Sequence, residues 1–171
     1  TERASKAEAD QRRGRAGRVA PGVCYRLWTK GEEGAMAGFA PPEIEVADLA
    51  PLALDLAQWG TAPADLALLT QPASGPWAEA LGLLDQLGAT AEGKITPHGQ
   101  ALARLPLHPR LGHMLMTAGA DAADIAALLS DRDILQSRDI DLLPAVQALR
   151  GDRNAQLREP AALKRIRAEA A

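Results

Sequence analysis

"SKAEADQRRGRAGR", residues 5–18, places four arginines and two glycines in its second half. Ser5, at its start, can cap a short helix, and we expect Gly14 and Gly17 to end that helix. Residues 22–28, GVCYRLW, alternate in polarity and predict a strand. Helix, glycine-rich turn and strand form one αβ unit, which is too small to bury a sheet face by itself.

The composition indicates a globular protein of one domain or two small ones. The chain has 171 residues, of which 47% are hydrophobic and 24% are charged. Only 3% are aromatic, so the core must consist of aliphatic side chains. The single cysteine, Cys24, excludes an internal disulfide and fits a reducing compartment. Without a long apolar run or a signal pattern, we expect a cytoplasmic protein that does not enter a membrane.

Charge is distributed unevenly along the chain. Residues 1–30 hold eight Lys and Arg against three Asp and Glu, whereas residues 31–171 hold eleven against nineteen. We therefore do not expect the whole surface to attract nucleic acid, and any contact with a polyanion should be local.

Beyond a loop rich in glycine and proline, the pattern becomes helical. We expect a helix ended by Gly60 and a hairpin around Glu92-Gly93. The other expected helices cover residues 63–70, 76–87 and 97–107, followed by several helices from residue 109 to 168. Helices followed by a small strand pair are typical of a winged helix. The predicted fold class is mainly α with a small α/β piece.

Three interpretations compete for the arginine-rich stretch. It could be a solvated basic turn, a contact to nucleic-acid phosphates, or an element of a nucleotide-hydrolysis site. A hydrolysis element needs the glycines, because two guanidinium groups must converge on one anion. It also needs a group such as Gln11 that orients the attacking water. The spacing favours this third interpretation.

The same stretch resembles motif VI of the DEAH-box (DEAH/RHA) branch of superfamily 2 helicases. That motif reads S-x-A-x-A-x-Q-R-x-G-R-A-G-R, and every specified position is met. Residues 22–27 are similar to the strand pattern G-x-C-[FY]-R-L that follows motif VI. The resemblance extends to about residue 135, and LPLHPRLGHML is most similar to bacterial HrpB-type members. Val46 departs from the family, because many relatives carry arginine there.

The resemblance implies four parts. These are the end of the second RecA-like domain with motif VI (1–28), a linker (29–42), a winged helix (43–107) and the start of a helical, ratchet-like HA2-type domain (108–171). It also implies that Arg15 and Arg18 contact the γ- and β-phosphates of ATP, with Arg18 as the arginine finger. Gln11 would position the hydrolytic water, while Gly14 and Gly17 would allow close approach of the nucleotide.

For Arg12 and Arg13 two alternatives stay open. They could contribute to function, or they could form ion pairs with Glu8 or Asp10.

By the same resemblance, the winged helix and ratchet-like elements would form one side of a channel for single-stranded RNA. Lys94, Arg104 and Arg110 are the only basic residues between positions 31 and 131, so they are the candidate RNA contacts. Ordinary surface charge is the alternative for all three. The cysteine and the tryptophans Trp59 and Trp77 are expected in the core.

No metal site is expected in this chain. The histidines His98, His108 and His113 lack the spacing of metal ligands, and there is no second thiol.

The sequence contains neither a G-x-x-x-x-G-K-[ST] loop nor a D-E-x-H box. ATP and Mg²⁺ would therefore be bound mainly by an upstream RecA-like domain of a longer parent chain. We expect this chain to be a C-terminal fragment of an ATP-dependent RNA helicase, inactive alone, and its end within KRIRAEAA suggests truncation. The alternative is a non-catalytic winged-helix adaptor that binds nucleic acid or protein.

Overall fold

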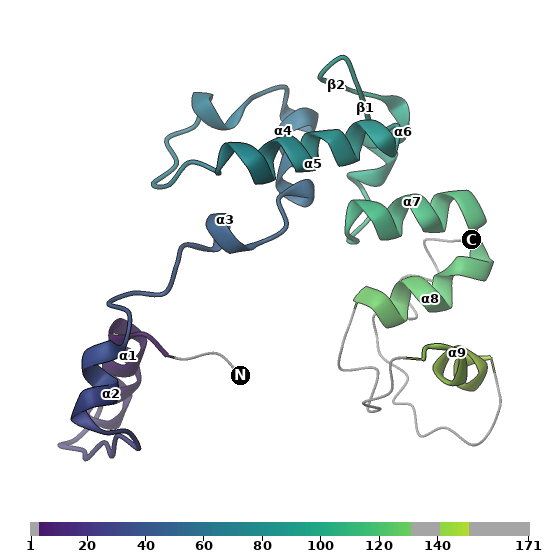
Figure 1. The fold of residues 1–171 in the computed structure, drawn as a ribbon. Helices are drawn as coiled ribbons and strands as arrows, with labels where there is room; N and C mark the ends of the chain where they lie inside the picture. Colours follow the sequence, from purple (N-terminus) through teal and green to yellow (C-terminus); the bar gives the residue numbers. More distant parts are fainter. Residues whose placement is uncertain (1–3, 131–140, 151–171) are drawn as a thin grey trace. The chain divides into compact units, whose positions relative to one another are not determined.

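A computed structural model describes residues 4–130 and 141–150 (Figure 1). The described part is mainly helical, as expected, and it divides into one compact unit that ends at Ala47 and another that starts at Asp48. The helix expected over 161–168 lies outside the described residues. The finer division at residues 28, 42 and 107 stays a prediction.

The first unit consists of three helices: α1 (Lys6–Ala16), α2 (Lys30–Ala35) and α3 (Glu43–Val46). Helix α1 is longer than expected, because it continues through Gly14 to Ala16. A glycine costs a helix only about 1 kcal/mol relative to alanine, and the arginines and alanine around it are good helix formers. Gly17 follows the helix with a φ of −105°, so it is not a left-handed cap.

The strand expected over residues 22–28 is not formed. Residues 21–27 have no regular secondary structure, and the apolar side chains that would share one strand face are exposed: Val23, Tyr25 and Leu27. A strand requires a neighbour for its backbone hydrogen bonds. In the described ranges the only sheet is a two-stranded one in the second unit, so this neighbour is missing.

The second unit contains the remaining elements. They are α4 (Ala50–Trp59), a 3₁₀ turn η1 (Pro63–Asp65), α5 (Ser74–Gln86), β1 (Thr90–Ala91), β2 (Lys94–Ile95), α6 (Pro97–Leu102), α7 (Pro109–Ala118), α8 (Ala120–Ser130) and α9 (Leu143–Leu149). Helix α4 packs on α5, and α7 packs on α8 (Figure 1). The helix expected over 63–70 is reduced to η1, and α6 is shorter than expected. After α6, a turn at residues 103–104 and Pro106 end the helical hydrogen bonding, whereas residues 66–70 have no helical structure and nothing in the described residues explains why.

The hairpin confirms the expectation from Glu92-Gly93. Thr90 pairs with Ile95 and Ala91 with Lys94 in an antiparallel register. The two turn residues have φ values of 50° and 75°, so both are left-handed. This is the backbone that a two-residue type I′ turn requires.

The core of the second unit is aliphatic, as the composition predicts. Leu56, Leu84 and Leu102 are almost fully buried, and the alanines of α8 pack against Leu115. Trp59, by contrast, is 72% exposed, so its expected place in the core is wrong. It is the last residue of α4, where Gly60 turns the chain away with a left-handed φ of 74°.

Candidate functional site

The first half of α1 is a firmly anchored scaffold. The Ser5 hydroxyl accepts a hydrogen bond from the Glu8 N–H (3.2 Å), while the Glu8 carboxylate accepts one from the Ser5 N–H (2.7 Å). This capping box satisfies the free N–H groups at the helix start. The Ser5 backbone hydrogen bond, and then its hydroxyl, lower the pKa of Glu8 below its ordinary value. Ser5 and Ala9 are buried, at 3% and 5% exposure.

The loop after α2 holds the same end of α1. The N–H of Lys6 donates to the Ala37 carbonyl (2.9 Å), and the N–H of Ala7 donates to the Gly38 carbonyl (3.0 Å). The serine and alanines of the motif therefore have partners within this chain.

The second half of α1 presents charged and polar groups to solvent. Gln11 and Arg15 are four residues apart and share a helix face, and Arg18 follows just beyond the helix end. All three are exposed, and no ion pair or side-chain hydrogen bond joins them to any residue of the described ranges. Their full hydrogen-bonding capacity is available to a ligand.

The other two arginines are paired on their own helix. The guanidinium of Arg12 lies 3.9 Å from the Glu8 carboxylate, and that of Arg13 lies 3.7 Å from the Asp10 carboxylate. These are the ion pairs that the sequence offers as the alternative to a functional role. Because both pairs are solvent-exposed, neither contributes much to the stability of the helix.

The motif's two glycines lie in open space. A Cβ added at Gly14 or Gly17 would meet no atom within 4 Å. Neither packing nor backbone conformation within the described residues therefore requires a glycine at these positions. The free space beside the unpaired arginines leaves room for a ligand or for another part of a larger protein.

Arg26 is a central residue that sequence reasoning missed. Its guanidinium bonds to Asp10 of α1 at 2.5 Å and also to Glu33 of α2. It lies 5.9 Å from the centre of the Trp28 ring. The hydrogen bond to Asp10 raises the pKa of Arg26 above its ordinary value. The arginine of the G-x-C-[FY]-R-L pattern marks the position, but its partners, 16 and 7 residues away, form no sequence signal.

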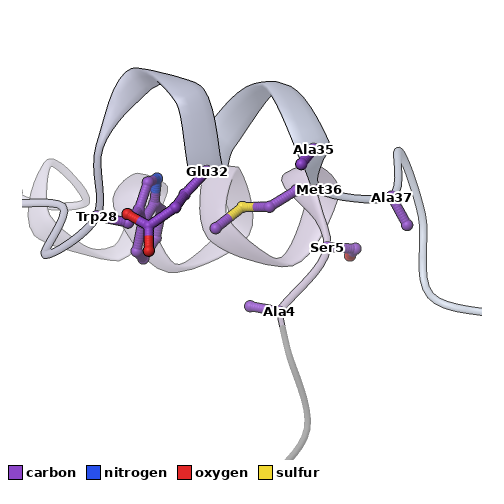
Figure 2. A pocket seen from close by; sticks show the side chains of 7 residues that line it. All are labelled: Ala4, Ser5, Trp28, Glu32, Ala35, Met36 and Ala37. Carbon is purple, nitrogen blue, oxygen red and sulfur yellow. The ribbon is translucent and has the colours of Figure 1, made fainter.

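A cavity of about 410 Å³ lies beside the start of α1 and the end of α2 (Figure 2). Its lining is mostly small or apolar: Ala4, Ser5, Trp28, Glu32, Ala35, Met36 and Ala37. The Trp28 Nε1 is buried and has no hydrogen-bond partner in the described part of the chain. None of the unpaired motif residues lines the cavity, so it is separate from the candidate site.

The basic residues proposed for RNA lie on different elements of the second unit. Lys94 is on β2, Arg104 follows α6, and Arg110 is in the first turn of α7; all three are exposed. Lys94 lines a shallow pocket of about 630 Å³ together with the exposed Trp59.

The histidines come closer together than their spacing suggests. His98 Nε2 lies 2.9 Å from His113 Nδ1, with the rings nearly perpendicular. His108 instead bonds to Asp48 at 3.1 Å. In the ranges that the structure describes, no group of three or more His, Cys, Asp or Glu side chains could hold a metal ion.

Two further observations concern the single cysteine and the length of the helices. Cys24 is exposed, so its expected place in the core is wrong; the strand that would have buried it has no sheet to join. No helix in the described ranges has the length and apolar character needed to span a membrane.

Comparison with known proteins identifies helicases. No protein-family model matches the chain. The ATP-dependent RNA helicase HrpB of Escherichia coli is 38% identical over 146 residues, which cover 82% of this chain and 18% of that protein. The ATP-dependent RNA helicase HrpA of the same organism is 34% identical over 121 residues, covering 67% of this chain and 9% of that protein.

The solved structures agree with the sequence relatives. A crystal structure of the Escherichia coli DEAH/RHA helicase HrpB superposes with a TM-score of 0.79 at 33% identity, covering 99% of this chain and 21% of that one. The chain thus spans about a fifth or less of the length of these relatives.

Proposed function

Because this chain is homologous to a segment of DExH- and DEAH-box RNA helicases, we propose that it is part of an ATP-dependent RNA helicase. In this proposal α1 supplies the arginine-finger half of the ATP site. The observation that carries it is the combination of unpaired Gln11, Arg15 and Arg18 with the open space at Gly14 and Gly17.

The chemistry of these groups suits phosphoryl transfer. A guanidinium is a planar fork of donors that matches phosphate oxygens, and it keeps its charge at any physiological pH. Arg18 would stabilise the charge that develops during transfer, Arg15 would bind the phosphates, and Gln11 would orient the attacking water. Arg12 and Arg13 lie beside carboxylates of their own helix, and this role does not need them.

The remainder of the ATP site would come from elsewhere in a longer chain. The sequence has no phosphate-binding loop, and the described residues offer no set of metal ligands. We therefore assign ATP's other contacts and Mg²⁺ to an upstream RecA-like domain, and we propose that residues 1–171 alone do not hydrolyse ATP. The exposed, alternating Val23, Tyr25 and Leu27 support a longer chain, because the sheet and covering helices of the second RecA-like domain, to which we assign residues 1–28, would pair with this segment and bury these side chains.

We assign the second unit to a winged helix and a ratchet-like domain that contact single-stranded RNA. The helices, the type I′ hairpin and the order of the elements support this assignment. Among the three basic candidates, Lys94 has the strongest support, since it shares a pocket with exposed Trp59. A cation beside an aromatic ring is a common binding surface for single-stranded nucleic acid.

Two measurements test the proposal. The first is the coding sequence upstream of Thr1: an in-frame phosphate-binding loop and D-E-x-H box are expected. The second is ATP hydrolysis by the intact protein in which Arg18→Ala is compared with Arg13→Ala. Loss of a finger lowers kcat by about 10³-fold or more, while removal of the paired Arg13 leaves kcat nearly unchanged. A winged-helix adaptor would instead show no upstream ATP site, and its RNA binding would not respond to ATP.

A further inference from the structure

The geometry around Arg26 points to a positioning role in the ATP site, an inference that rests on the proposed function. Three separate segments meet at this side chain: α1 through Asp10, α2 through Glu33, and the segment that carries Arg26 itself. The Arg26 side chain is only 25% exposed, although its neighbours Tyr25 and Leu27 are 85% and 94% exposed. Arg26 therefore folds back onto the helices while its neighbours point outward.

Helix α1 needs such a link because only its first half is anchored. Its one buried residue is Ala9, and the loop hydrogen bonds reach Lys6 and Ala7. From residue 11 onward the side chains are exposed. Asp10 lies at the boundary between the anchored half and the half that carries Gln11 and the arginines.

A second contact from the same segment reaches the end of α1. The backbone of Gly22 approaches so closely that an added Cβ would lie 1.8 Å from the Ala16 carbonyl oxygen. Residues 22–26 thus touch α1 at Asp10 and at Ala16, on both sides of Gly14. We propose that Arg26 fixes the direction of α1, and with it the positions of Gln11, Arg15 and Arg18 relative to ATP.

The shape of the side chain matters as much as its charge. Arg26 uses separate N–H groups, Nη1 and Nη2, for the two carboxylates, with the Trp28 ring beside the guanidinium. A lysine ammonium is a compact point charge that cannot span two carboxylates in this planar way. Arg26→Lys should therefore keep the charge and lose most of the positioning.

The expected effect is on the rate of the chemical step. A displacement of a catalytic group by about 1 Å can lower a rate by about 10²-fold. In the intact protein, Arg26→Ala and Arg26→Lys should lower kcat for ATP by about 10- to 100-fold, with a smaller change in KM. Asp10→Asn keeps the shape of its side chain and removes the charge, so it should reproduce part of this loss. Arg13→Ala, which removes Asp10's other partner, is the matched control.

Combining the variants separates positioning from general stabilisation. Because Arg26 acts through Gln11, Arg15 and Arg18 together, Arg26→Ala should lower kcat by a smaller factor when it is added to Arg18→Ala than when it is made alone. If the loss of kcat in the double variant equals the product of the two single losses, the positioning role is overturned. An unchanged kcat for Arg26→Ala would also overturn it. Where Arg26→Ala does not fold, an unchanged kcat for Asp10→Asn would do the same. An unchanged kcat for Arg18→Ala would instead refute the proposed function itself.

Discussion

Substitution of Gly99 tests how the hairpin and α6 are joined. A Cβ built at Gly99 would lie 2.0 Å from the Ala89 carbonyl oxygen and 2.8 Å from Cγ1 of Ile95. The carbonyl cannot easily move away, because it accepts hydrogen bonds from the Thr96 N–H (3.0 Å) and hydroxyl (3.2 Å). Gly99→Ala must therefore separate α6 from the hairpin.

The magnitude follows from the contacts that would be lost. Overpacking of a tight site costs roughly 1–3 kcal/mol, and each lost hydrogen bond costs about 1 kcal/mol. The higher helix propensity of alanine returns about 1 kcal/mol. Gly99→Ala should lower the free energy of unfolding by about 2–4 kcal/mol.

The assay is urea unfolding of the full 171-residue chain, followed by circular dichroism. A loss of this size moves the midpoint down by about 1–2 M urea. Gly82→Ala is the matched control, because Gly82 is also helical but has nothing within 4 Å of an added Cβ. The control should raise stability by about 0.4–1 kcal/mol. Equal midpoints for the two variants would refute the steric reasoning.

Two further predictions concern helix starts. The pKa of Glu8 is lowered from 4.5, so its carboxylate stabilises α1 fully above that pH and loses its effect as the pH falls through the lower folded value. Amide exchange of residues 8–9 should therefore be faster in Glu8→Gln than in the parent at pH 7, and the two should converge in acid; a constant difference down to pH 2 would contradict this. Asp48 accepts from the Ala50 N–H (2.8 Å) and bonds to His108, which accepts from the Arg110 N–H (3.2 Å). Asp48→Ala should cost about 1–2 kcal/mol in urea unfolding and Asp48→Asn clearly less, because asparagine keeps an acceptor for the Ala50 N–H; equal losses would show that this hydrogen bond is unimportant.

Local signals predicted those elements whose causes lie within a few residues. The hairpin follows from Glu92-Gly93, and the end of α4 follows from Gly60, because each left-handed backbone is a local requirement. The aliphatic core followed equally directly from a composition with few aromatic residues.

The features that the sequence did not predict correctly depend on contacts between residues far apart in the chain. Residues 22–28 carry a strand pattern, but a strand forms only beside another strand, which no pattern within these residues supplies. The pair formed by His98 and His113, and the contacts of Arg26, join residues from different elements. Such pairs are decided by packing rather than by spacing along one helix.

Within the candidate site, the structure divides the motif into two groups. Ser5, Ala7 and Ala9 are buried or hydrogen-bonded within the chain, and any helix start of this kind would favour them. The other group consists of residues that this chain does not explain: Gln11, Gly14, Arg15, Gly17 and Arg18. A glycine inside α1 lowers its stability, and clustered unpaired arginines repel one another, so neither feature benefits the isolated fold. Residues that lower the stability of the isolated fold, and gain no compensating contact within it, are those expected to bind a ligand. This asymmetry within fourteen residues is the physical reason to seek the phosphate of ATP beside the second half of α1.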